Sequence, residues 1–125
     1  MGRRYKIGKV VNQVGFCNNV DLPYVASNEG GHYVYIRKYN KKTGICKVST
    51  ITSLEDEKDN IKTERIPNLR NGRIYPIPKK DANFNLWSGV NMNYMYVHRS
   101  KIHNIGDRWF LSKHKLPIGK KKKKK

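Results

Sequence analysis

The sequence lacks the features of a membrane or secreted protein. It contains no run of about 18 apolar residues, the length that a transmembrane helix needs, and only 37% of its 125 residues are hydrophobic. No apolar segment follows the charged start at Arg3 and Arg4, so we expect no signal peptide. Lys6 stands where a myristoylation box requires Ser or Thr. We therefore expect a cytoplasmic protein with no membrane partner.

Cysteine motifs and metal-ligand motifs are also scarce. Cys17 and Cys46 lie far apart and form no Cys-x-x-Cys motif, so we expect free thiols in a reducing compartment. The four histidines have no metal-ligand spacing: His32, His98, His103 and His114. The sequence has no Gly-rich phosphate loop and no nucleophile elbow. We predict neither a metal site nor a cofactor.

Acidic residues are few. The chain has 9 Asp and Glu against 27 Lys and Arg, a formal net charge of +18, and without the six lysines at 120–125 the balance is still +12. Such a charge favours a polyanionic partner, because it makes the folded chain repel itself. We predict binding to RNA or another single-stranded nucleic acid. An anionic membrane surface is a weaker alternative as the partner, since no basic amphipathic helix is present. The positive charge can also have no binding role and simply reflect a lysine-rich proteome.

The apolar pattern favours strands. Short runs of apolar and β-branched residues are separated by Gly, Asn and Pro, which is typical of all-β proteins. We expect strands at 7–14, 32–37, 45–52, 73–77 and 94–97. Turn-forming residues at 39–44 predict a hairpin between the second and third of these strands. We expect a loop at 18–31, a loop or one exposed helical turn at 55–60, and a short helix or turn at 100–105.

Chain length and strand count predict one small barrel. A chain of 125 residues has the size of a single domain, and closing roughly five to seven short strands removes exposed sheet edges. SH3-like and OB-like barrels both fit this count. We expect an all-β or mainly β fold with one barrel domain at 1–112 and a short helix or turn. Like charges repel, so we expect 113–125 to be a disordered basic tail.

The strand before the hairpin turn carries aromatic residues on one face. Side chains alternate along a strand, so Tyr33, Tyr35 and Arg37 share one face. Val34 and Ile36 lie on the other. Tyrosines on a basic protein can stack unpaired bases, but the same face can also form the barrel interior, and both interpretations stay open. We expect Arg37 to be functional or solvated, because an unpaired arginine is rarely buried.

Further basic and aromatic residues extend the predicted nucleic-acid surface. We assign Arg73, Lys79 and Lys80 to phosphate binding. Trp87 lies in an Asn-rich segment and can stack a base, although packing under the barrel is an equal alternative. Four hydroxyl side chains near the end of the strand at 45–52 can bind phosphate oxygens, or can simply reflect the preference of threonine for strands.

Four short segments follow one another in an order shared with a known family: 5–11, 32–36, 48–53 and 86–90. They read Tyr-Lys-Ile-Gly-Lys-Val-Val, His-Tyr-Val-Tyr-Ile, Val-Ser-Thr-Ile-Thr-Ser and Leu-Trp-Ser-Gly-Val. They resemble the first three strands and a later segment of the MazF/PemK-like toxin family. The resemblance extends over residues 5–105 and rests on short motifs.

This resemblance implies an SH3-like barrel, usually a homodimer, with an antitoxin protein as a partner. It also implies metal-independent cleavage of single-stranded RNA by attack of the ribose 2′-OH on the adjacent phosphate. Thr52 and Ser53 match the family at the end of the third strand, whereas His32 and Tyr33 stand where it has Arg-Pro. We assign acid–base catalysis to His32 and stabilisation of phosphate charge to Arg37.

The hairpin predicts where these residues meet. The midpoint of 32 and 52 is 42, which lies in the expected turn, so we expect His32 and Thr52 to face each other across the antiparallel pair. The resemblance thus implies a metal-independent endoribonuclease. The alternatives are a barrel from a phage or mobile element that binds nucleic acid without cleaving it, and a protein-interaction domain with a basic tail.

Overall fold

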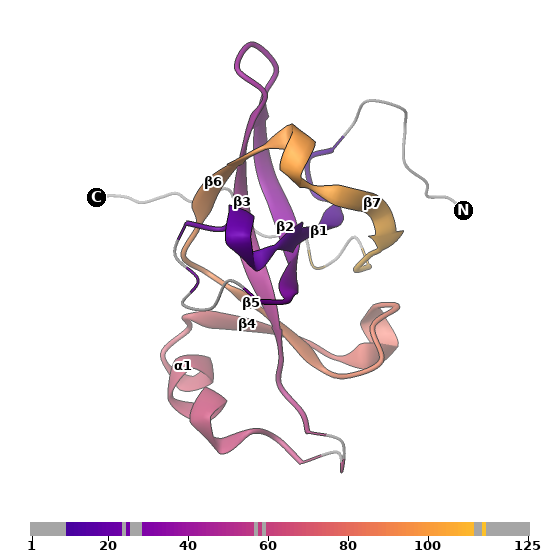
Figure 1. Cartoon of the computed structure of the whole chain (residues 1–125). Coiled ribbons are helices and arrows are strands. Elements are labelled where there is room, and N and C mark those ends of the chain that lie inside the picture. The colour runs from indigo at the N-terminus through magenta and orange to yellow at the C-terminus, as the bar shows by residue number, and fades with distance from the viewer. Residues whose placement is uncertain are drawn as a thin grey trace.

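The computed structural model describes residues 10–23, 25, 29–56, 58, 60–111 and 114 (Figure 1). The start of the first expected strand, at 7–9, lies outside the described residues, as does the expected tail at 113–125 apart from His114. In the part of the chain that is described, no helix is long and apolar enough to cross a membrane.

The described residues form a mainly β, barrel-like fold, which confirms the predicted fold class. The strands are β1 (Val14–Asn18), β2 (Gly31–Asn40), β3 (Ile45–Ser53), β4 (Ile74–Ile77), β5 (Ser88–Asn91), β6 (Met95–His98) and β7 (His103–Arg108). They build one antiparallel sheet in the order β4-β5-β3-β2-β1-β7, with β6 also beside β3.

Short helical elements connect the strands. The α-helix α1 (Ile66–Arg70) precedes β4 and has Pro67 in its first turn, where a missing N–H costs no helical hydrogen bond (Figure 1). The 3-10 helices are η1 (Asn19–Asp21), η2 (Thr63–Arg65), η3 (Lys79–Asp81) and η4 (Arg99–Lys101). The short helix or turn predicted at 100–105 overlaps η4, whereas the sequence analysis gave no prediction for the α-helix α1.

The central hairpin of β2 and β3 confirms the predicted register. Val34 pairs with Thr50, and the turn between the strands lies at 41–44. A bulge between Ile36 and Lys38 shifts the register by one residue toward the turn. Gly44 has a φ of 78°, a left-handed conformation that glycine adopts without steric cost.

Strand β3 changes partner halfway along its length. Its first half pairs with β6, and its last residues, Ile51 to Ser53, pair with β5. This divides the fold into two apolar clusters, one containing Val34 and Ile36 and the other containing Tyr35 and Ile51. Strand β2 is therefore buried on both faces.

Two expected elements lie differently in the structure. In the described part of the strand expected at 7–14, Asn12 has a φ of 71°, which interrupts extended backbone, so β1 begins at Val14. The segment expected to be a short helix or turn at 100–105 is helical only as far as Lys101, where η4 ends, and His103 begins strand β7. Strand β7 has mostly polar residues, so its sequence shows no alternation of apolar and polar residues that would predict a strand.

Candidate nucleic-acid interface

The catalytic pair predicted from the hairpin does not form. The ladder between β2 and β3 ends at Val34 and Thr50. Beyond it, His32 pairs with β1, whereas Thr52 pairs with β5. The predicted pairing of His32 with Thr52 is thus absent from the ladder, which ends two residues earlier on each strand.

His32 is held by the segment that follows β1. Its Nδ1 lies 2.6 Å from Asn19 Oδ1, and Asn19 Nδ2 donates to the Glu29 carbonyl at 2.6 Å. Asn19 Oδ1 is thus an acceptor, so Nδ1 carries the proton of the neutral imidazole. Burial lowers the pKa of His32, and the Arg65 charge lowers it further. The arrangement keeps His32 neutral and fixed in orientation.

Arg37 lies inside the fold rather than at the predicted solvated position. It is 3% exposed, and its Nη1 donates to Ser49 Oγ at 3.2 Å and to the Met92 carbonyl at 3.0 Å. Burial lowers the pKa of the guanidinium. Ser53 also has an internal partner, since its Oγ accepts from Lys62 Nζ at 2.8 Å. Of the residues predicted for catalysis, Thr52 and Ser53 both pair with β5, whereas His32 is bonded to Asn19 and Arg37 is buried against Ser49 and Met92.

The aromatic face of β2 is interior, so one of the two interpretations left open by the sequence is wrong. Tyr35 is 2% exposed, stacks on Phe110 with ring centroids 6.1 Å apart, and donates its hydroxyl hydrogen to Asn12 Oδ1. Tyr33 is half-buried, with its ring against those of Phe16 and Phe84 at 5.3 and 5.2 Å. These tyrosines stabilise the second apolar cluster and do not form an exposed stacking platform.

The other predicted nucleic-acid residues have varied surroundings. Arg73 and Lys80 are exposed, so their assignment to phosphate binding stays a prediction. Lys79 is exposed as well, with its Nζ 4.0 Å from Glu55 Oε1. Trp87 is half-buried, and its backbone N–H donates to the same carboxylate oxygen at 3.1 Å.

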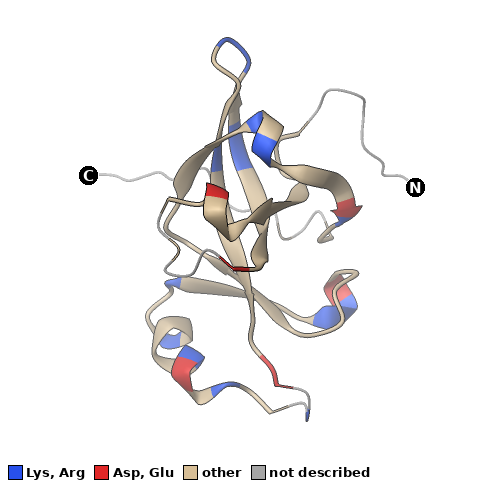
Figure 2. Cartoon of the chain, viewed as in Figure 1, with Lys and Arg blue, Asp and Glu red and all other residues tan. Residues whose placement is uncertain are grey.

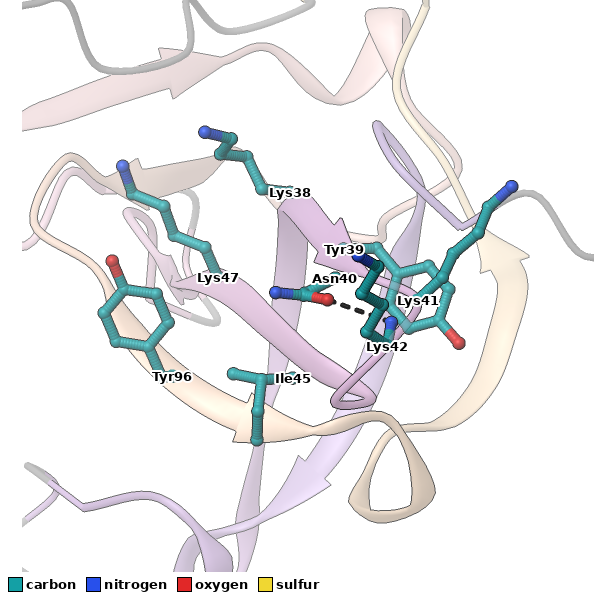
Figure 3. Close-up of a pocket in the computed structure, with 8 residues that line it drawn as sticks. All are labelled: Lys38, Tyr39, Asn40, Lys41, Lys42, Ile45, Lys47 and Tyr96. Atoms are coloured by element: carbon teal, nitrogen blue, oxygen red, sulfur yellow. Dashed lines mark hydrogen bonds between the residues drawn. The ribbon is translucent and has the colours of Figure 1, made fainter.

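The structure instead places an open groove on the outer face of β2, β3 and β6 (Figure 3). Its volume is about 730 Å³, and we call it the Lys–Tyr groove. Its lining residues are Lys38, Tyr39, Asn40, Lys41, Lys42, Ile45, Lys47 and Tyr96. Lys38 pairs with Lys47 across β2 and β3, and Lys47 pairs with Tyr96 across β3 and β6. These three residues therefore form one row across three strands.

Two exposed tyrosines lie on and just before β6: Tyr96 lines the groove, and Tyr94 lies beside it against Tyr96 and Lys47. Tyr94 and Tyr96 are 45% and 58% exposed, with their rings edge to face at a centroid distance of 5.7 Å. Lys47 Nζ lies 3.9 Å from the centre of the Tyr94 ring, a cation–π contact. Met95 and Val97, which alternate with the tyrosines, are buried in the first apolar cluster. Burial of these neighbours holds the tyrosines at the surface.

The groove is strongly positive. Four of its eight lining residues are lysines and none is acidic. The whole segment 31–53, which contains β2, the turn and β3, has no Asp or Glu, and Lys and Arg lie along it up to the turn (Figure 2). Partial burial lowers the pKa of Lys47, and the charges of Arg37 and Lys38 lower it further. An anion in the groove would relieve this repulsion between cations.

Buried Arg37 and Ser49 hold the turn that precedes Tyr94. Arg37 donates to the Met92 carbonyl, and Ser49 Oγ donates to the Asn93 carbonyl at 2.9 Å. Both bonds fix the backbone immediately before the exposed ring. Arg37, predicted to touch phosphate, instead supports the wall of the groove.

Sequence reasoning treated the segment 94–97 as a strand but not as part of a site. The signal was available, because the order Tyr-Met-Tyr-Val places two tyrosines on one face and two aliphatic residues on the other. Lys38 and Lys47 could be placed together from the hairpin, since they lie close to symmetrically about its turn.

Comparison with known proteins adds no relative. The chain matches no known family model and no curated protein. The resemblance to the MazF/PemK-like family therefore stays a prediction based on the short motifs described above.

Proposed function

We propose that the protein binds single-stranded RNA or DNA in the Lys–Tyr groove. The observation that carries this proposal is the exposure of Tyr94 and Tyr96 beside four lysines, in a groove with no acidic lining residue. Stacking platforms next to basic side chains are the usual means of binding single strands.

The tyrosines would bind bases. An exposed tyrosine offers an apolar ring that gains free energy when a base covers it. Base–aromatic stacking contributes about 1–3 kcal/mol per base and tolerates different bases. Tyr96, the more exposed ring, lies in the same row as Lys38 and Lys47, so a base on this ring would have its phosphate close to ammonium groups.

Binding is better supported than cleavage. Arg37, to which the prediction gave the stabilisation of phosphate charge, is 3% exposed and donates to Ser49 and the Met92 carbonyl inside the fold. A bound phosphate would therefore not reach it.

We also propose that the protein is cytoplasmic. Cys17 and Cys46 are buried and free, and free thiols are typical of a reducing compartment. A homodimer and an antitoxin partner stay predictions of the family resemblance.

Fluorescence anisotropy with labelled strands of about ten nucleotides, a length within the range that small barrels bind, tests the proposal. We expect Tyr96→Ala to weaken binding by about 1–3 kcal/mol without lowering the melting temperature. Trp109→Ala is the matched control, since Trp109 is also an exposed aromatic residue, at 38%, but does not line the groove. Equal effects of the two variants would overturn the assignment of the groove.

The same strands, incubated with the protein in EDTA and analysed on a denaturing gel, test the enzymatic alternative. We expect them to remain intact while bound. Discrete products that end in a 2′,3′-cyclic phosphate would instead support the metal-independent ribonuclease that the resemblance implies.

A further inference from the structure

Asn40, the last residue of β2, has one end of its side-chain amide fixed by the hairpin turn. Its Oδ1 accepts hydrogen bonds from the backbone N–H groups of Lys42 and Thr43 at 2.9 and 3.3 Å. This is an Asx turn, in which the side chain imitates a backbone carbonyl. Reversing the amide would point its NH₂ group at two N–H donors and lose both bonds. The turn therefore determines which end of the amide faces the ligand.

The other end of this amide faces the groove. Figure 3 shows Asn40 Nδ2 pointing away from the turn, toward Ile45 and Lys47. Asn40 is exposed and pairs directly with Ile45 across the hairpin. A flat ligand that lies over Ile45 would thus present one edge to an N–H donor whose orientation the backbone has already set.

Donors dominate the rest of the groove. The four lysines supply ammonium groups, which donate and cannot accept. The side-chain hydroxyls of Tyr39 and Tyr96 both donate and accept, and Asn40 Oδ1 is already occupied by the turn. The groove therefore suits a ligand edge that is rich in hydrogen-bond acceptors.

Nucleic-acid bases differ in this respect at the edge farthest from the sugar. Uracil, thymine and guanine carry a carbonyl oxygen there, whereas cytosine and adenine carry an amino group. A carbonyl accepts from Asn40 Nδ2 or a lysine, but an amino group meets these donors with another donor. Base pairing uses one hydrogen-bonding capacity of each of these groups and stacks each base on its neighbours, so a base that stacks on Tyr96 has to come from an unpaired strand.

We propose that the Lys–Tyr groove selects keto bases over amino bases and that Asn40 is the residue that determines this specificity. The inference rests on the proposed function and extends it from any single strand to strands rich in uracil, thymine or guanine. One hydrogen bond gained in place of a donor–donor contact corresponds to a preference of about three- to tenfold.

Two pairs of strands of equal length measure the preference: oligo(dU) against oligo(dC), and oligo(dI) against oligo(dA). The distal carbonyl replaces an amino group within each pair. We expect the wild-type protein to bind the keto strand of each pair about three- to tenfold more tightly. A ratio of one in both pairs would overturn the inference and leave the proposed function standing. Failure to bind any of the four strands would overturn the proposed function itself.

Asn40→Asp isolates the role of the amide. Aspartate keeps an oxygen to accept from Lys42 and Thr43, so the turn is retained, but it replaces the Nδ2 donor with an acceptor. We expect weaker binding overall and loss of the keto preference. Lys58→Gln is the control for charge, because it lowers the net charge by the same one unit at an exposed residue that does not line the groove, and we expect its ratio to equal that of the wild type.

A third variant excludes charge and misfolding as explanations. Asn40→Ser keeps a hydroxyl that can accept from the turn but has no second polar atom and no charge. With melting temperatures near that of the wild type, we expect its keto-to-amino ratio to fall to about one. A ratio that stays at the wild-type value in both Asn40 variants would show that Asn40 does not determine specificity.

Discussion

The ammonium nitrogen of Lys47 lies 3.9 Å from the centre of the Tyr94 ring. Lys47 is on β3, and Tyr94 immediately precedes β6, which pairs with this half of β3. The contact therefore connects the charged row of the Lys–Tyr groove with its aromatic wall. It orients the lysine beside the tyrosines, where a base and its phosphate would both be within reach.

Lys47→Gln should reduce the salt dependence of binding. Each phosphate neutralised in a single strand contributes about 0.7 to the slope of log K against log salt, so we expect the slope to fall by about this amount. Anisotropy titrations at several salt concentrations give the measurement. Lys58→Gln is the control, since Lys58 is exposed but does not line the groove. An equal fall in both slopes would mean that positive charge anywhere on the surface contributes to binding and that the groove is not the binding site.

Arg37→Met should loosen the turn before Tyr94 as well as destabilise the fold. It leaves the Met92 carbonyl and Ser49 Oγ without this donor, and lost hydrogen bonds to a charged group cost about 1.5–3 kcal/mol. Urea denaturation measures the loss of stability, and anisotropy in the absence of urea measures nucleic-acid affinity. We expect both to decrease, with Ser49→Ala giving smaller changes in the same direction. Unchanged affinity in a folded Arg37→Met protein would separate the buried arginine from the groove.

Tyr35 variants should affect stability rather than binding. Tyr35→Ala removes a buried ring from the second apolar cluster, and such truncations cost about 3–5 kcal/mol. Tyr35→Phe keeps the buried ring and removes the hydrogen bond to Asn12, worth about 1 kcal/mol. Thermal melting ranks the three proteins. Retained stability in Tyr35→Ala together with a loss of nucleic-acid affinity would restore the stacking role first predicted for this residue.

The lowered pKa of His32 gives the stability a defined pH dependence. The unfolded chain binds a proton at this histidine near its ordinary value of 6.5, whereas the folded chain binds it only at lower pH. Between these two values the unfolded state holds more protons, so stability rises with pH in this window and falls on acidification below about 6.5. Urea denaturation at several pH values should show a shallower decrease for His32→Gln than for the wild type. Parallel curves would contradict the assigned pKa shift.

Local chemistry alone determined the central hairpin. Turn-forming residues at 39–44 lie between two segments of alternating, β-branched and aromatic residues, and this pattern specifies a turn and a register without reference to the rest of the chain. Val34 pairs with Thr50 because the two residues are equally far from residue 42, the centre of the predicted turn. Strand β7 was missed, because its pairing with β1 depends on backbone hydrogen bonds rather than on an apolar pattern.

What the sequence determined by itself was the mainly β class, the hairpin and the positive charge, because each depends on residues that are neighbours along the chain. Tertiary structure decided which faces are covered. Alternation places Tyr33, Tyr35 and Arg37 on one face and Tyr94 with Tyr96 on another, but it is identical for a covered face and an exposed one. Strands β4 and β5 and the ring of Phe110 bury the first face, whereas the second remains exposed beside the lysines of the hairpin. Such coverage depends on contacts between segments distant in the sequence, and these form only when the whole sheet has folded.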